Sequence, residues 1–181
     1  MRKSVLIGGI GNVLLGDDAI GPYVISLLES QYSFGDGVEI ADLGTPALDI
    51  THRIAGLQAV IFVDCVASDD HRPGTVLLFR KSEMLCARPT PRLDPHSPAL
   101  SECLLTTEML GTSPQQLLLV GVVGEYFDPG RPLSQAVRQA AEKGVAAVLS
   151  ELKRLQVEYR KRLPPVESSI WWADDPSTPG M

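Results

Sequence analysis

Two adjacent carboxylates, Asp17 and Asp18, are the side chains in this sequence whose position most clearly suits them for chemistry. They follow a glycine-rich turn at residues 8–11, which comes directly after the apolar run at residues 5–7, and a helical pattern begins at Ile20. Bare backbone N–H groups at such a helix start attract anions such as phosphate. Here two acidic side chains occupy that position. We therefore expect the site to attract a cation or a polar peptide and not a nucleotide.

Two further side chains could join Asp18 in one site. Asp64 ends a continuous apolar run at residues 59–63, and His96 lies in the proline-rich loop at residues 94–98. Two carboxylates and an imidazole form an open ligand set that suits a divalent transition ion such as zinc, nickel, iron or manganese. Such an ion would acidify a bound water or polarise a carbonyl. The spacing alone leaves two other interpretations open: Asp64 as a turn-forming residue at a strand end, and His96 as a solvated loop histidine.

Other interpretations of the opening segment are a helix cap and a dinucleotide site. Asp17 could cap the helix that starts near Ala19, and we favour this structural role for Asp17. Residues 9–11 begin the GxGxxG pattern of dinucleotide sites, and Asp42 follows the second strand as that pattern expects. However, the third glycine position holds Leu14, and the acidic pair would repel a pyrophosphate.

The elements that must position these residues alternate between strand and helix along the chain. The pattern predicts strands at residues 5–8, 38–43, 59–64, 74–80 and 117–123, and helices at residues 20–28, 48–55, 100–110 and 133–157. This order predicts a three-layer α/β/α sandwich with a mostly parallel five-stranded sheet and one antiparallel edge strand. In such sheets ligands bind beyond the carboxyl ends of the strands, where the candidate residues lie. We expect one domain over residues 1–158 and a disordered tail rich in Pro, Ser and Asp over residues 159–181.

Composition excludes several classes of protein. The formal net charge of −6 and the lack of a long basic run argue against binding to nucleic acid. No apolar stretch approaches the roughly 18 residues of a membrane span, so we expect no membrane insertion. The three cysteines, Cys65, Cys86 and Cys103, are odd in number and form no CxxC pair, which is typical of buried free thiols in the cytoplasm. Strand alternation should turn Cys65 away from the side that Asp64 faces.

The motifs of this chain resemble those of the hydrogenase maturation proteases. These endopeptidases trim the C-terminal extension from the large subunit of nickel–iron hydrogenases. The residues at 9–21 are similar to the family's opening motif, and those at 42–45 are similar to its Asp-Gly-Gly-Thr element. The strand that ends in Asp64, the pair Pro95-His96 and the strand at 119–125 resemble its remaining motifs in the same order. The resemblance covers residues 5–155.

The resemblance implies that Asp18, Asp64 and His96 contact a metal, with Asp18 and Asp64 as the catalytic pair. It also implies that the metal is nickel already inserted in the substrate, so that the protease senses this ion and holds no tight cofactor of its own. The partner would be the large-subunit precursor, and we expect the protease to act as a monomer. Which carboxylate is the base, and whether the ion takes part directly in catalysis, stay open.

The second motif implies substrate contacts by Asp42, Gly44 and Thr45. It departs from the family pattern at Leu43, where the family usually has glycine, so these contacts follow less directly than the metal contacts. Two other functions stay open: a nickel-binding maturation chaperone without hydrolysis, and a nucleotide-binding α/β domain.

Overall fold

The sheet at the centre of the molecule has five strands. The computed structural model describes the backbone of residues 4–45, 50–85, 97–166 and 170, and the side chains of the same residues except 97–99. Within these residues the strands are β1 (Val5–Ile10), β3 (Val38–Gly44), β4 (Ala59–Val66), β5 (Val76–Arg80) and β6 (Gln116–Val123). Their order is β3-β1-β4-β6-β5, with β5 antiparallel to β6 and the other pairs parallel. The predicted mostly parallel sheet with one antiparallel edge strand is confirmed.

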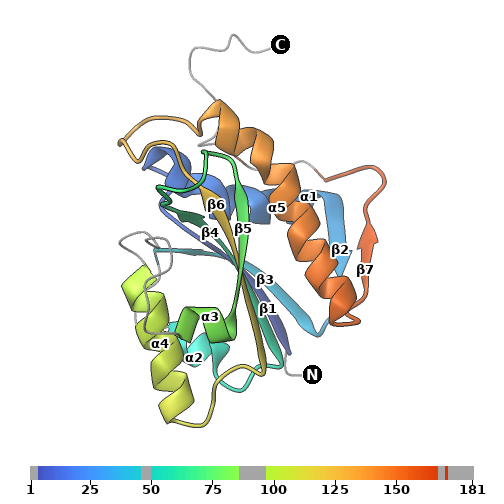
Figure 1. Ribbon diagram of the computed structural model, residues 1–181. Coiled ribbons are helices and arrows are strands. Elements are labelled where there is room, and N and C mark those ends of the chain that lie inside the picture. The colour runs from blue at the N-terminus through green and yellow to red at the C-terminus, as the bar shows by residue number, and fades with distance from the viewer. Residues whose placement is uncertain (1–3, 46–49, 86–96, 167–169, 171–181) are drawn as a thin grey trace.

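Helices cover both faces of this sheet, as Figure 1 shows. The helices α1 (Ile20–Gln31) and α5 (Gln135–Arg154) pack on one face, and α2 (Ile50–Ile54), α3 (Lys81–Leu85) and α4 (Ser97–Met109) pack on the other. Strand β4 is buried along its whole length, and its side chains alternate between two hydrophobic cores. Val63 and Cys65 belong to the core under α1 and α5, whereas Phe62 belongs to the core under α2 and α4. The three-layer sandwich is thus built on two cores that share one sheet.

Two glycines let α1 approach the central strands closely. A Cβ atom at Gly9 would lie 2.6 Å from the carbonyl oxygen of Gly21, and a Cβ atom at Gly21 would lie 2.6 Å from the carbonyl oxygen of Val63. A Cβ atom at Gly21 would also overlap the carbonyl oxygen of Ile10. Because these neighbours are backbone atoms, a larger residue would push the helix away from β1 and β4. The opening motif therefore needs its glycines partly for packing.

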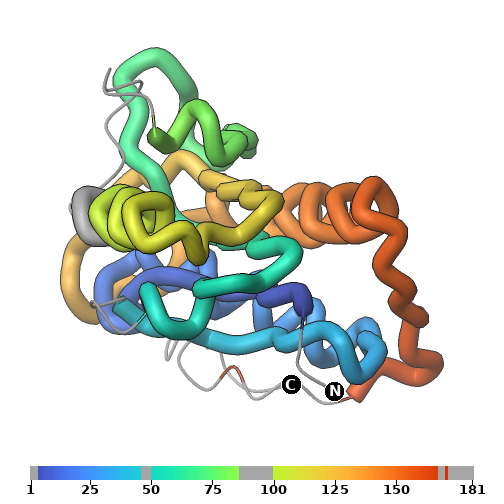
Figure 2. Tube along the Cα trace, turned by 90° about the horizontal axis from the view of Figure 1, so that it is seen from below, coloured from blue at the N-terminus to red at the C-terminus, as the bar shows by residue number. Residues whose placement is uncertain are grey.

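A second, small sheet differs from the expectation for the end of the chain. Strands β2 (Tyr32–Phe34) and β7 (Tyr159–Lys161) pair in antiparallel fashion beside α5, and Figures 1 and 2 both show them side by side. The rings of Tyr32 and Tyr159 meet edge to face with centroids 5.8 Å apart. The backbone N–H of Val166 donates to the carbonyl oxygen of Ser30. The segment predicted to be a tail from residue 159 therefore forms ordered structure through residue 166, because it pairs with the chain after α1.

Two helices differ from the expected elements. Helix α3 follows β5 directly and was not predicted, and α5 ends at Arg154, three residues before the predicted end. The thiols of Cys65 and Cys103 are buried, as predicted, whereas Cys86 lies outside the described residues. Within the part of the chain that the structure describes, no helix has the length and apolar character needed to cross a membrane.

Candidate functional site

The topology places a ligand crevice between β1 and β4. From β1 the chain runs outward through α1 to β3, and from β3 it returns through α2, on the opposite face, to β4 on the other side of β1. The connections therefore diverge to opposite faces between β1 and β4. In open α/β sheets, ligands bind outside the carboxyl ends of the strands at this kind of switch point. The candidate residues of the first and third motifs follow these two strands.

Asp18 lies in a short 3-10 helix, η1 (Gly16–Ala19), between β1 and α1, and is 1% exposed. One of its carboxylate oxygens accepts a hydrogen bond of 2.7 Å from the backbone N–H of Asn12, and its own N–H donates to the carbonyl oxygen of Leu15. Gly11 has φ +140° and lies directly against the Asp18 carbonyl, so no side chain fits there. The turn after β1 thus folds back on itself and holds the carboxylate in one orientation.

Asp64 lies inside β4 and is 2% exposed. Its Oδ1 accepts a hydrogen bond of 2.8 Å from the backbone N–H of Cys65, which fixes the orientation of the carboxylate. Its register partner on β6 is Gly121, which has no side chain to occupy the space beside Asp64. Cys65 points into the core under α1 and α5, away from the face of Asp64, as predicted from strand alternation.

The fold brings Asp18 and Asp64 to the same edge of the sheet. The 3-10 helix that carries Asp18 contacts β4, and Gly21 packs on the carbonyl of Val63, the residue before Asp64. Two buried carboxylates oriented by backbone N–H groups can hold a divalent cation or take a proton from water. His96 lies outside the described residues. Within the described ranges no group of three or more His, Cys, Asp and Glu side chains is arranged to hold a metal ion, so the three-residue set stays a prediction.

Asp17 points in another direction and is completely buried. Its carboxylate accepts hydrogen bonds from the backbone N–H groups of Glu125 at 2.8 Å, Tyr126 at 3.4 Å and Ser134 at 2.6 Å. Asp17 therefore has a structural role, as we favoured, but this role differs from the predicted cap of its own helix. It ties the connection between β6 and α5 to the opening motif. These partners lie 108 to 117 residues away in the chain, and nothing in the sequence pointed to them.

Burial and the nearby carboxylate of Asp17 also affect the hydroxyl group of Tyr126. The pKa of its hydroxyl is raised, first by burial and next by the carboxylate of Asp17. The hydroxyl donates to the carbonyl oxygen of Pro132 at 2.8 Å, and the guanidinium of Arg131 lies 3.7 Å from the ring centroid. Tyr126 therefore remains a neutral hydrogen-bond donor that braces its own loop.

The second motif, residues 42–45, is hydrogen-bonded to the first motif, residues 9–21. Oδ1 of Asp42 accepts a hydrogen bond of 2.8 Å from the N–H of Gly44, which adopts φ +57°. The carbonyl oxygen of Gly44 accepts a hydrogen bond of 2.9 Å from the N–H of Gly11. Asp42 and Thr45 are exposed beside the crevice, so a substrate could reach them. Leu43, the departure from the family pattern, packs over Gly8 and borders the core under α2 and α4.

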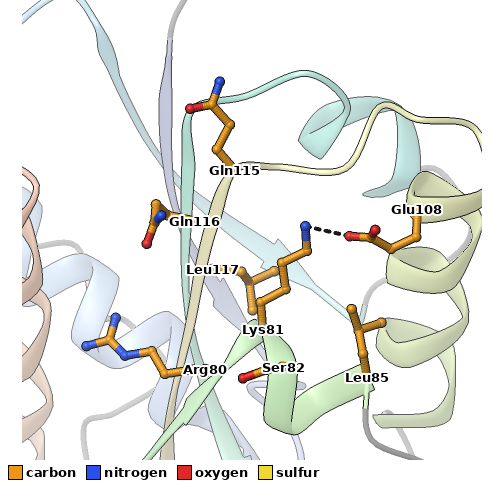
Figure 3. A pocket seen from close by; sticks show the side chains of 8 residues that line it. All are labelled: Arg80, Lys81, Ser82, Leu85, Glu108, Gln115, Gln116 and Leu117. Atoms are coloured by element: carbon orange, nitrogen blue, oxygen red, sulfur yellow. Dashed lines mark ion pairs between the residues drawn. The ribbon is translucent and has the colours of Figure 1, made fainter.

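A separate pocket lies at the opposite end of the sheet, where β5 ends and β6 begins (Figure 3). Its volume is about 440 Å³. Lys81 and Glu108 form an ion pair of 2.5 Å across it, and the Lys81 ammonium also donates to the carbonyl oxygen of Pro114. This charge is already satisfied within the protein. The pocket is also remote from the carboxyl ends of β1 and β4, so it is not part of the candidate site.

Comparison with known proteins identifies the family. A model of the hydrogenase maturation proteases matches residues 22–151. The chain belongs to the hydrogenase maturation protease family. The hydrogenase 2 maturation protease of Escherichia coli (strain K12) is 34% identical over 154 residues, which cover 85% of this chain and 93% of that protein.

Solved structures of this family share the fold. The hydrogenase maturating endopeptidase HybD from E. coli superimposes with a TM-score of 0.81 at 32% identity, over 91% of this chain and 99% of that one. The maturation protease HybD from Thermococcus kodakarensis has a TM-score of 0.67 at 24% identity, over 83% of this chain and 99% of that one, and supports the fold alone. The α/β sandwich described above is therefore the fold of a hydrogenase maturation protease. The chain is accordingly a peptidase of hydrogenase maturation.

Proposed function

We propose that this chain is the endopeptidase that removes the C-terminal extension from the large-subunit precursor of a nickel–iron hydrogenase after nickel insertion. The observation that carries the proposal is the pair of buried carboxylates, Asp18 and Asp64, at the switch point of a chain that belongs to this protease family. The proposal places the reaction in the cytoplasm, with a monomer as the acting unit.

In this proposal the nickel ion is a feature of the substrate. The precursor carries it into the crevice, where Asp18, Asp64 and His96 contact it, and the protease holds no tight cofactor of its own. Two carboxylates and one imidazole form a modest ligand set with open positions, which suits an ion shared with the ligands of the precursor. Helix α4, which begins directly after His96 in the chain, starts at the same end of the sheet as the crevice (Figure 1).

The chemistry needs one water molecule and one proton acceptor. Water adds to the carbonyl carbon of the peptide bond, a carboxylate takes the proton from the water, and the proton passes to the leaving amide nitrogen. Asp18 and Asp64 each accept a backbone hydrogen bond that orients the carboxylate, so neither needs to reorient to take part. Asp42 and Thr45 are exposed and would contact the precursor at the rim of the crevice. Gly44 connects this second motif to the first.

The test uses purified protein and nickel-loaded precursor, with mass spectrometry to follow release of the C-terminal peptide. We expect cleavage by the unmodified protein and a loss of at least about 100-fold in rate for Asp18→Asn and for Asp64→Asn, because each removes a charge from the reacting centre. His96→Ala should also lose cleavage.

Asp36→Asn is the matched control, because Asp36 is exposed in the turn between β2 and β3 at the other end of the sheet. It should cleave at the normal rate. Thermal unfolding of each variant separates a lost reaction from a lost fold. Binding of the precursor without any cleavage would refute the protease proposal and favour a chaperone.

A further inference from the structure

The segment between β6 and α5, residues 124–134, lies against the turn that follows β1. We call this segment the β6–α5 connection. The carboxylate of Asp17 accepts three hydrogen bonds from its backbone N–H groups, and the N–H of Asp17 donates to the carbonyl oxygen of Tyr126 at 3.1 Å. The N–H of Gly130 donates to the carbonyl oxygen of Leu14 at 2.9 Å. Asp17 therefore takes part in all but one of these bonds between the two segments.

The same connection is joined to β4, the strand that carries Asp64. Strands β4 and β6 pair over their whole length, and directly after β6 the N–H of Gly124 donates to the carbonyl oxygen of Val66 at 3.1 Å. The next residue, Glu125, donates to the Asp17 carboxylate at 2.8 Å. Backbone and hydrogen bonds therefore form a continuous path from Asp64 to the turn, and the Asp17 carboxylate is the side chain that completes it.

Close packing at Gly124 follows the same path. A Cβ atom at Gly124 would lie 2.8 Å from Sγ of Cys65 and 3.5 Å from Cβ of Asp17. Gly124 thus lies between Asp17 and the residue that follows Asp64. Cys65 is also the residue whose N–H orients the Asp64 carboxylate. The position of Asp17 relative to β4 is therefore fixed by packing as well as by hydrogen bonds.

The turn is attached to the sheet on its other side by α1. This helix follows the turn directly, and its Gly21 packs on the carbonyl of Val63. Within the turn, Asp18 is bonded to the N–H of Asn12, so the carboxylate moves with the turn. Without the Asp17 carboxylate, the β6–α5 connection loses three of its bonds to the turn. The turn can then pivot about its contact with β4.

We propose that Asp17 is a positioning residue for the cleavage reaction. Its carboxylate sets the separation between the carboxylates of Asp18 and Asp64, because it fixes the turn against the β6–α5 connection. Asp17 is completely buried and acts through Asp18. The proposal rests on the proposed function, in which Asp18 and Asp64 act on the same peptide bond.

This role predicts which kinetic constant changes. A misplacement of about 1 Å at a reacting centre can cost about 100-fold in rate. Asp42 and Thr45, which would contact the precursor, lie at the end of β3 and not in the β6–α5 connection. Displacement of the turn therefore lowers kcat while KM for the precursor is maintained.

The experiment compares Asp17→Asn with the unmodified protein in the precursor cleavage assay. Asparagine has nearly the same size, but one of the two acceptor oxygens of Asp17 is replaced by a donor that faces a backbone N–H. We expect kcat to fall roughly 10- to 100-fold and KM to stay within about twofold. A rise in KM at an unchanged kcat would overturn the proposal.

Glu151→Gln separates positioning from a loss of folded protein. Glu151 pairs with Arg80 and Arg154 at the far end of α5, so its replacement lowers stability without reaching the turn. Each variant is assayed at the same interval below its own unfolding temperature. Glu151→Gln should then keep the normal kcat. An equal loss of kcat in Glu151→Gln and Asp17→Asn would refute the positioning role.

Gly124→Ala tests the same link without a change at Asp17. Its methyl group would meet Sγ of Cys65 and displace the β6–α5 connection, so kcat should fall here as well. Gly35→Ala is the matched control, because nothing lies within 4 Å of a Cβ atom there, and it should cleave at the normal rate. If Asp17→Asn does not fold, a normal kcat in Gly124→Ala overturns the proposal.

Crystal structures of the variants give a readout that does not depend on cleavage. We expect the separation of the Asp18 and Asp64 carboxylates to change by about 1 Å in Asp17→Asn, or in Gly124→Ala if the former does not fold, and to stay the same in Glu151→Gln. If the unmodified protein does not cleave the precursor, the proposed function fails and this separation alone decides on Asp17. A changed separation supports the positioning role, and an unchanged one refutes it.

Discussion

Asp17 and Asp18 are neighbours in the chain, yet their carboxylates are held by different parts of the molecule. Asp18 is bound by Asn12 within its own turn, whereas Asp17 is bound by Glu125 and Ser134 of a distant connection. Both charges are buried, and in both cases backbone N–H groups offset the cost of desolvation. One carboxylate is therefore oriented for the crevice and the other joins two segments of the fold.

Asp42 offers a test of the second motif at the scale of a single side chain. Its Oδ1 holds the N–H of Gly44, and Gly44 in turn accepts a hydrogen bond from Gly11. Asp42→Ala removes this acceptor and should reduce kcat/KM for the precursor roughly fivefold, the equivalent of about 1 kcal/mol. Asp42→Asn keeps an acceptor oxygen at the same place and should retain most of the activity if the turn is what matters. Equal losses in both variants would instead assign the effect to the charge of Asp42.

Helix α1 must approach β1 and β4 closely, and Gly21 allows this contact. In Gly21→Ala the new methyl group would meet the backbone carbonyls of Ile10 and Val63, which cannot move aside as a flexible side chain could. We expect a loss of at least about 2 kcal/mol in the free energy of unfolding, measured with urea. Gly35→Ala is the matched control, because nothing lies within 4 Å of a Cβ atom there, and it should change stability by less than about 0.5 kcal/mol. Similar stability of the two variants would show that α1 does not depend on this contact.

The far end of α5 is joined to the edge strand β5 by a buried acid. Glu151 is 4% exposed and forms ion pairs of 2.7 Å with Arg80 and 2.8 Å with Arg154. Burial acts to raise the pKa of Glu151, but the hydrogen bonds from Arg154 and Arg80 outweigh it, so the pKa lies below its ordinary value of 4.5. A carboxyl group with a lowered pKa in the folded state stabilises the protein above its unfolded-state pKa. This stabilisation is lost as the pH falls through the folded-state pKa.

Glu151→Gln should therefore be less stable than the unmodified protein by about 1–2 kcal/mol at pH 7, a value that allows for solvent screening of the half-exposed arginines. Urea unfolding between pH 7 and pH 3 measures the difference. It should stay constant down to about pH 4.5 and shrink below that pH. A difference that grows on acidification would contradict this account of the ion pairs.

At the scale of the whole molecule, the long elements could be read from the sequence and the short ones could not. Strand β4 is eight residues long and buried on both faces, so its continuous apolar run identifies it. The position of Asp64 follows from the same pattern, although the strand continues for two residues beyond the predicted end at Asp64. Strands β2 and β7 have three residues each, too few for a period to show. They form because α1 and α5 are neighbours on one face and deliver the following segments to the same place. The partners of Asp17 escaped prediction for the same reason: they depend on contacts between segments distant in the chain.

The pairing of β2 with β7 predicts that residues 159–166 belong to the folded unit. A chain stopped after residue 158 loses β7 and the hydrogen bonds that Arg162 and Val166 donate to the carbonyl oxygens of Gln31 and Ser30. A chain stopped after residue 166 keeps all of these contacts. We expect the shorter chain to lose about 1–3 kcal/mol of stability, a decrease of several degrees in the unfolding temperature, because several backbone hydrogen bonds and the packing of two tyrosine rings are removed. The chain stopped after residue 166 should keep this contribution and unfold at a higher temperature than the shorter chain. Differential scanning calorimetry of the three chains checks this, and equal unfolding temperatures for all three would mean that β7 adds nothing to the folded domain.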